Sequence, residues 1–290
     1  MAAGSEYRDG YFTCADGLQL HFRDYPGPAG SVPLLCLPGL TRNVRDFADF
    51  ASRMSPRHRT LVLEFRGRGE SDFDPEPQRY LPPIYARDAI ELLDYLGIAK
   101  AVFVGTSLGG IVAMLIAVMA GERIAGSILN DVGPELSEAG LDRIRTYVGS
   151  GKSFSTWAEA AEAVAENQSR LPAAWGPAEW ELMARRLCKL GADARIRFDY
   201  DPGIAEPFRT ATGTPDVDMW PLFDALAKHP LLILRGEHSE LFTAAALEAI
   251  ASRNANIHTA IVAGAGHAPE LDEPEAIVAI DRFLAEVEAP

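Results

Sequence analysis

One serine of this chain lies in the setting that nucleophilic catalysis requires. Ser107 is the centre of Gly105-Thr106-Ser107-Leu108-Gly109, a G-x-S-x-G pattern. The apolar run AVFVG enters this pattern, and an uncharged apolar stretch follows it to Ala120. A strand, a sharp turn with serine at its apex and a helix form a nucleophile elbow, where the glycines leave room for the strained turn. Ser107 is therefore the candidate nucleophile.

A histidine must accompany this serine, because a free hydroxyl is a poor nucleophile without a nearby base. Histidine suits the role, since its pKa of about 6.5 lets it exchange a proton near neutral pH. His267 is the best placed, because it follows a buried strand in the glycine-rich loop 263–267, which can bend toward the elbow. The other histidines are interpreted as structural or facing solvent: His21, His58, His229, His238 and His258.

Strands alternate with helices along most of the chain, which predicts an α/β fold with a mostly parallel, doubly wound sheet. Strands are expected at 32–37, 60–65, 101–105, 124–130, 231–234 and 257–262, and helices at 44–54, 85–96, 108–120, 243–252 and 275–287. Period-two patterns at 11–14 and 18–25, around a Gly turn, predict an edge hairpin. His21 falls on the polar face of that hairpin, so we expect it at the surface.

A helical block interrupts this alternation between residues 134 and 220. Segments inserted after strand ends lie where open α/β sheets bind ligands. We therefore predict a core of residues 1–133 and 221–290 with a helical cap, 134–220, over the site. Aromatic residues of the cap are candidates for lining an apolar pocket, or for packing the cap itself: Tyr147, Phe154, Trp157, Trp175 and Trp180.

Four sequence pieces, taken together and in order, resemble the α/β-hydrolase superfamily over essentially the whole chain. They are Leu37-Pro38-Gly39-Leu40, the loop FRGRGES at 65–71 with Glu64 before it, the GTSLGG elbow, and GAGHAPELDEP near the end. The resemblance implies the superfamily fold and a triad in the chain order nucleophile, acid, histidine.

The resemblance also implies where the remaining catalytic groups lie. Glu240 matches the position at which the superfamily usually has its aspartate, and we favour it as the triad acid. Asp131 is the alternative, because some members carry their acid just past the strand after the elbow. The backbone N–H groups of Leu40 and Leu108 are the expected oxyanion-hole donors.

The composition of the chain argues against some classes of binding partner. The formal net charge of −14 argues against nucleic acid and anionic membranes, which bind clustered Lys and Arg. The single RGRG run is interpreted as a glycine-bent loop rather than an RNA-binding element. Three widely spaced cysteines suggest no disulfide framework, and with no leader-like N-terminus we expect a cytoplasmic protein, possibly a homodimer. The uncharged run 101–120 is a formal transmembrane candidate, but its Gly-Ser cluster argues against that interpretation.

These observations predict a serine hydrolase that cleaves a carboxylic ester or lactone of a small apolar substrate. No metal-ligand spacing or dinucleotide-binding motif occurs in the expected context, so we expect no metal and no cofactor. Serine at the elbow argues against dehalogenase and epoxide-hydrolase chemistry, which the superfamily performs with aspartate. Alternatives on the same fold are a C–C bond hydrolase and a cofactor-free perhydrolase, and an alternative of another class is a non-catalytic ligand receptor.

Overall fold

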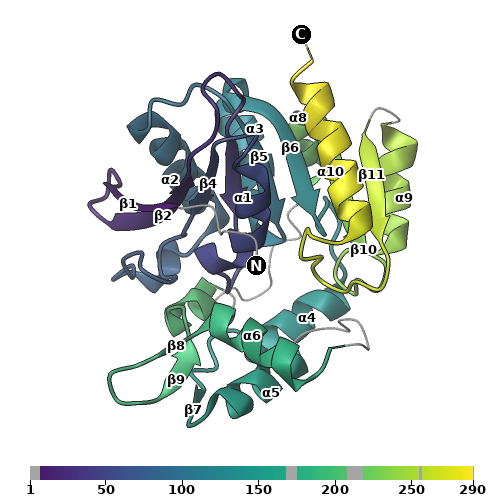
Figure 1. Ribbon diagram of the computed structural model, residues 1–290. Coiled ribbons are helices and arrows are strands. Elements are labelled where there is room, and N and C mark those ends of the chain that lie inside the picture. Colours follow the sequence, from purple (N-terminus) through teal and green to yellow (C-terminus); the bar gives the residue numbers. More distant parts are fainter. Residues whose placement is uncertain (1–6, 168–174, 208–217, 255–256, 290) are drawn as a thin grey trace.

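The computed structural model describes residues 7–167, 175–207, 218–254 and 257–289 (Figure 1). Its centre is an eight-stranded sheet in the order β1-β2-β4-β3-β5-β6-β10-β11. The strand bounds are β1 (Arg8–Thr13), β2 (Gln19–Tyr25), β3 (Leu34–Leu37), β4 (Thr60–Leu63), β5 (Ala101–Thr106), β6 (Ile124–Asn130), β10 (Leu231–Gly236) and β11 (His258–Val262). Neighbours from β4 to β11 pair in parallel, which confirms the predicted fold class.

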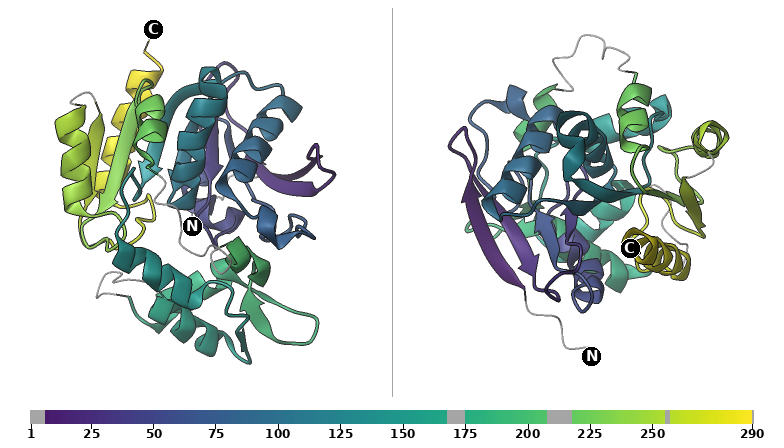
Figure 2. Two further views of the ribbon diagram at one scale, coloured as in Figure 1. Left: turned by 180° about the vertical axis from the view of Figure 1, so that it is seen from behind. Right: turned by 90° about the horizontal axis from the view of Figure 1, so that it is seen from above.

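Helices cover both faces of this sheet (Figure 2). One apolar core joins the sheet to α2 (Pro82–Tyr95), α3 (Leu108–Ala120), α8 (Trp220–Leu226) and α9 (Ala244–Arg253). A second core, on the opposite face, includes α1 (Ala48–Met54) and α10 (Pro274–Val287). The central strands β3, β4 and β5 are buried along their whole length, as their continuous apolar runs predict. None of the helices in the described ranges is long and apolar enough to cross a membrane.

The edge hairpin forms as predicted, with β1 antiparallel to β2. The expectation that His21 lies at the surface is wrong, because this side chain is only 2% exposed. Its ring nitrogens bond the carboxylates of Glu64 (2.8 Å) and Asp9 (2.9 Å). The burial of His21 is explained by these two carboxylates, which give both ring nitrogens a partner.

The chain from residue 132, two positions after the end of β6, to residue 219, just before α8, is here called the inserted segment. Its described elements are α4 (Glu138–Tyr147), β7 (Ser153–Phe154), α5 (Trp157–Asn167), α6 (Pro177–Leu187), β8 (Cys188–Leu190), β9 (Ile196–Phe198) and the short 3-10 helix η4 (Pro202–Ala205). Figure 1 shows these elements grouped below the main sheet. Three of them form a small separate sheet, β7-β9-β8, which helical periodicity did not predict.

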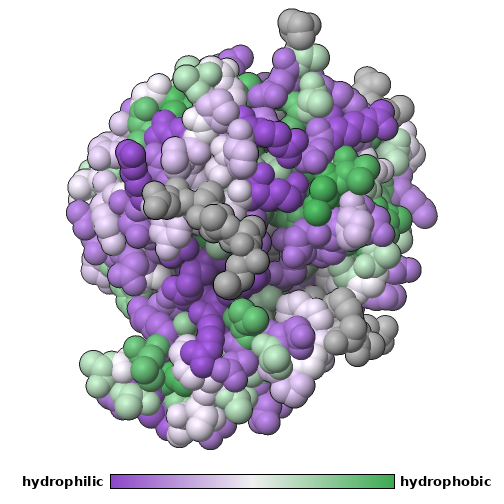
Figure 3. Space-filling model, viewed as in Figure 1, coloured by the Kyte–Doolittle hydropathy of each residue, from purple (hydrophilic) through white to green (hydrophobic). Residues whose placement is uncertain are grey.

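Ion pairs join the inserted segment to the body of the molecule. Arg45 bonds Asp199 (2.7 Å), and Arg186 bonds Glu270 (3.0 Å). Figure 3 shows hydrophilic residues gathered at this junction. Contacts of this kind fix the segment over the carboxyl end of the sheet, where Ser107 lies.

Candidate active site

The turn at Ser107 has the strained geometry that its sequence predicts. Ser107 lies between β5 and α3 with φ +52° and ψ −114°, outside the regions that residues with a side chain favour. A Cβ on Gly105 would lie 2.5 Å from the backbone of Gly109, and one on Gly109 would lie 1.9 Å from the Leu37 carbonyl oxygen. Glycine is therefore required at both positions, since the strand, the turn and the helix touch backbone to backbone.

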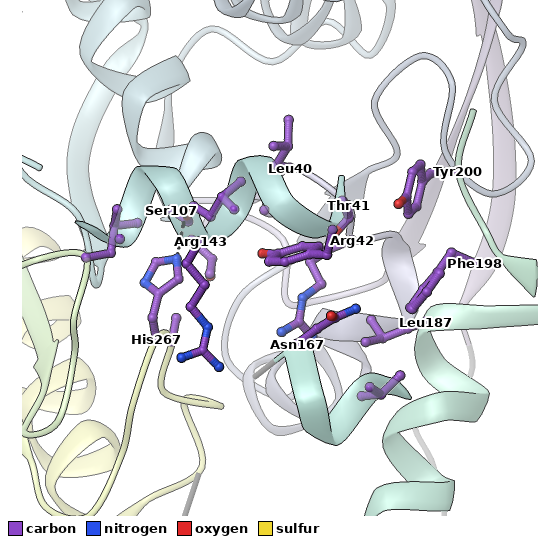
Figure 4. A pocket seen from close by; sticks show the side chains of 18 of the residues that line it. Leu40, Thr41, Arg42, Ser107, Arg143, Asn167, Leu187, Phe198, Tyr200 and His267 are labelled. Carbon is purple, nitrogen blue, oxygen red and sulfur yellow. Dashed lines mark hydrogen bonds between the residues drawn. The ribbon is translucent and has the colours of Figure 1, made fainter. Parts of the chain in front are cut away.

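His267 lies within hydrogen-bond distance of this serine. The hydroxyl of Ser107 donates to Nε2 of His267 at 2.9 Å (Figure 4). His267 follows β11, in the loop that leads to α10, and its side chain is 16% exposed. The structure thus brings together two residues that are 160 positions apart in the chain.

The structure corrects the choice of acid. Asp131, not Glu240, accepts the hydrogen bond from Nδ1 of His267, at 2.6 Å. Glu240 lies in the loop that follows β10, where its side chain is 43% exposed and its carboxylate bonds Arg143 at 3.2 Å. Glu240 lines the pocket without contacting His267, whereas Asp131 follows β6 directly and is fully buried. The favoured assignment of Glu240 is therefore wrong, and the alternative fits the geometry.

The loop after β10 nevertheless contributes to the acid's position. The N–H of Gly236 donates to Oδ1 of Asp131 at 2.8 Å, and the hydroxyl of Ser239 donates to Oδ2 at 2.6 Å. With the bond from His267, both oxygens of the buried carboxylate are satisfied, as a buried charge requires. Sequence reasoning did not identify Ser239, and its only signal was its place in the loop where the acid was expected.

The two proposed oxyanion donors lie beside Ser107. Leu108 is the first residue of α3, and the first N–H groups of a helix have no partner within the helix. Leu40 lines the same pocket, and a Cβ on the preceding Gly39 would lie 4.0 Å from the Cβ of Ser107. The carbonyl of Leu40 accepts bonds from Nε and Nη2 of Arg68, at 3.0 and 2.8 Å.

A buried ionic network surrounds Arg66, two residues before Arg68 in the loop that follows β4. The Arg66 guanidinium, 0% exposed, bonds both oxygens of Asp88 at 2.8 and 2.7 Å and also bonds Asp74 and Asp16. These carboxylates raise the pKa of Arg66 despite its burial, so the arginine stays charged. Arg66 and Arg68 are both buried, so the arginines of this RGRG run bond groups inside the molecule.

A pocket opens beside the Ser107 hydroxyl, between the sheet and the inserted segment. Eleven of its nineteen described lining residues are glycine, apolar or aromatic, and eight are polar or charged: Gly39, Leu40, Thr41, Arg42, Thr106, Ser107, Gly140, Arg143, Ile144, Tyr147, Val164, Asn167, Leu187, Phe198, Tyr200, Glu240, Leu241, His267 and Ala268. Figure 4 shows side chains of this lining around Ser107 and His267. Of the five predicted aromatic candidates, Tyr147 lines this pocket.

The other four pack within the inserted segment itself. Phe154 belongs to its apolar core, and Trp157, Trp175 and Trp180 pack against that core. The rings of Trp175 and Trp180 meet edge to face, with centroids 5.0 Å apart. His238, 46% exposed, faces solvent as expected.

Together, the elbow and the sheet define the class of this protein. The model of the alpha/beta hydrolase family matches residues 34–280, and the chain belongs to that family of enzymes. It is 30% identical to 3-hydroxybutyrate-oligomer hydrolase from Cupriavidus necator, over 96% of this chain and 97% of the relative. It is also 30% identical to 2-(acetamidomethylene)succinate hydrolase from Mesorhizobium japonicum, over 88% and 89%.

A solved structure shows the same architecture. The crystal structure of an alpha/beta hydrolase from Novosphingobium aromaticivorans is 50% identical to this chain and superposes with a TM-score of 0.91. The match covers 98% of this chain and 99% of that one. The chain is thus a hydrolase of the alpha/beta family.

Proposed function

We propose that this hydrolase is a serine esterase whose triad is Ser107, His267 and Asp131. The observation that carries the proposal is the continuous hydrogen-bond relay from Ser107 through His267 to Asp131, with bonds of 2.9 and 2.6 Å. In such a relay the histidine takes the serine proton, and the buried carboxylate fixes the imidazole tautomer and stabilises the imidazolium.

The reaction proceeds in two halves. Oγ of Ser107 attacks the ester carbonyl carbon while its proton passes to Nε2 of His267, and the N–H groups of Leu40 and Leu108 stabilise the oxyanion. The tetrahedral intermediate collapses, the C–O bond breaks, and the leaving alcohol takes the proton from His267. Water then attacks the acyl-enzyme, with His267 accepting its proton, and the free acid departs as Ser107 regains its hydrogen.

The proposed substrate is a carboxylic ester, or lactone, of a small acid that is largely apolar. The apolar and aromatic residues of the pocket lining support this choice. The Cupriavidus necator relative acts on 3-hydroxybutyrate oligomers, and oligomers of a hydroxy acid are joined by ester bonds. The hydrogen-bonded relay argues against a non-catalytic receptor, which has no need of it.

Substitution of the nucleophile tests this proposal. Ser107→Ala should abolish turnover of p-nitrophenyl butyrate and prevent labelling by a fluorophosphonate probe. The matched control is Ser252→Ala, because Ser252 is on α9, where its hydroxyl bonds only helix carbonyls. Turnover by Ser107→Ala at the wild-type rate would remove the proposal.

A further inference from the structure

The pocket beside Ser107 carries positive charge although the protein as a whole is acidic. The formal net charge of the chain is −14. Apart from the histidine, the described lining residues whose side chains are ordinarily charged at neutral pH are Arg42, Arg143 and Glu240. Two arginines against one glutamate give these lining side chains a formal charge of +1, which the Asp46 carboxylate bonded to Arg42 reduces. The pocket is therefore much less negative than the protein as a whole, and an anionic substrate meets less repulsion there than over the rest of the surface.

Arg143 is placed to contact a substrate directly. It lies on α4, on the same face as Gly140, Ile144 and Tyr147, all of which line the pocket at helical spacing. Figure 4 shows its side chain extending beside His267, within the pocket that contains Ser107. Arg143 is thus the charged member of a helix face whose other pocket-lining residues are glycine, isoleucine and tyrosine.

The present partners of Arg143 leave much of its donor capacity unused. Nη1 donates to Oε2 of Glu240 at 3.2 Å, and Nη2 donates to the carbonyl of Glu166 at 3.3 Å. Both distances exceed the 2.7–2.9 Å that is usual for charge-assisted bonds. The Arg143 and Glu240 side chains are 36% and 43% exposed, so water screens their attraction. A better-placed carboxylate can displace Glu240 at little cost.

Arg42 adds to the field but is already paired. Its Nη1 donates to Asp46 at 2.9 Å, one helical turn away. Glu270 lies close by and bonds Arg186 at 3.0 Å. Burial and the nearby Asp46 outweigh the two arginines and raise the pKa of Glu270 to about 7. The Asp46 carboxylate therefore largely neutralises Arg42, and Arg143 remains the arginine with capacity for a ligand.

We propose that the substrate is an ester that also carries a free carboxylate, and that Arg143 binds this carboxylate in place of Glu240. The inference rests on the proposed esterase function and deepens it. A carboxylate offers two oxygens to the planar guanidinium fork of Arg143, and its single negative charge takes the place of the Glu240 charge. A phosphate monoester, with a charge of about −1.5 to −2, would bring more negative charge than the single Glu240 carboxylate that it displaces. Half-esters of dicarboxylic acids and short oligoesters with a carboxyl terminus belong to the proposed class.

Two esters of matched size test the inference. The p-nitrophenyl half-ester of glutaric acid carries a carboxylate at the far end of its acyl chain, and p-nitrophenyl pentanoate has a methyl group there. The measured quantity is the ratio of kcat/KM for the charged ester to that for the neutral ester. We expect the ratio to exceed about 10 in the wild type, since a hydrogen-bonded charge is worth about 1.5–3 kcal/mol. The ratio should fall as salt is added.

Three variants identify the residue responsible. Arg143→Gln should lower the ratio at least about tenfold, and Arg143→Lys should restore part of it. Glu240→Gln should raise the ratio, because it removes the anion that competes for Arg143. Arg145→Gln is the matched control, two residues along α4, where Arg145 pairs with Asp142 outside the pocket lining. It should leave the ratio unchanged.

The outcomes separate this inference from the proposed function. Hydrolysis of both esters with a ratio near one, or with a ratio that Arg143→Gln does not change, overturns the inference and leaves the esterase in place. Hydrolysis of neither ester overturns both. A fall in the ratio on Glu240→Gln also contradicts the inference, because it would mean that the Arg143–Glu240 pair serves to hold α4 in place.

Discussion

Replacing Asp131 with asparagine distinguishes the two acids that the sequence offered. In the structure, Oδ1 of Asp131 accepts from the Gly236 N–H, and Oδ2 accepts from Ser239 and His267. Asparagine keeps an acceptor for the Gly236 N–H but directs its NH₂ group toward Nδ1 of His267. The imidazole then holds its proton on Nε2 and cannot accept the proton of Ser107. We expect kcat to fall about 10⁴-fold, the loss typical of a wrong tautomer, or about 5 kcal/mol in the activation barrier.

The assay is kcat on saturating p-nitrophenyl butyrate, with a thermal melt to show that the variant is folded. Glu240→Gln is the comparison, and its loss should be smaller by about three orders of magnitude, since no described contact joins Glu240 to His267. The double variant Asp131→Asn/His267→Ala should lose no more than His267→Ala alone, because residues of one relay act as a unit. Near-normal kcat in Asp131→Asn, with loss in Glu240→Gln, would refute the reasoning.

Three further predictions follow from the supports of the site. Arg68→Lys removes the pair of hydrogen bonds from one guanidinium to the Leu40 carbonyl. We expect kcat to fall about tenfold to a hundredfold with little change in KM. A change in KM alone would contradict this positioning role of Arg68. Gly109→Ala places a Cβ 1.9 Å from a β3 carbonyl oxygen and should reduce unfolding free energy by about 1–3 kcal/mol in a denaturant titration, whereas Gly121→Ala, whose Cβ meets only one side-chain atom at 3.5 Å, should change it less. Burial raises the pKa of Glu270 to about 7, so ionisation of this carboxyl lowers the stability of the folded protein as the pH rises from about 4.5 to about 7. The Tm of Glu270→Gln should therefore decline less over this range than the Tm of the wild type. Parallel Tm profiles of the two proteins would disprove this prediction.

The sequence by itself determined the fold and most of the elements. Continuous apolar runs alternate with amphipathic helices, and only a parallel sheet covered on both faces buries both patterns. Strand β6 has the predicted bounds, and the ends of α9 and α10 lie within one residue of the ends predicted for these two helices. The strained turn at Ser107 could be predicted locally as well, because the glycines that permit it are its near neighbours in the chain.

Local pattern failed where burial depends on a distant partner. The period-two pattern of β2 placed His21 on the polar face, yet Glu64, on another part of the chain, makes its burial favourable. Short strands such as β8 and β9 were missed, because two or three residues carry too little periodicity to distinguish from a helix. Three tryptophans that suggested a pocket lining instead pack against the apolar core of the inserted segment.

The acid partner of His267 could be decided only by the tertiary structure. Asp131 and Glu240 both follow strand ends at the same edge of the sheet, so chain order and element type allow either. The β6–β10 pairing places Asp131 next to the Gly236 N–H, which donates to its carboxylate, and the turn after β10 directs Glu240 outward to Arg143. Which of two carboxylates reaches an imidazole depends on a few ångströms of strand register and loop direction, and these arise only when the sheet assembles.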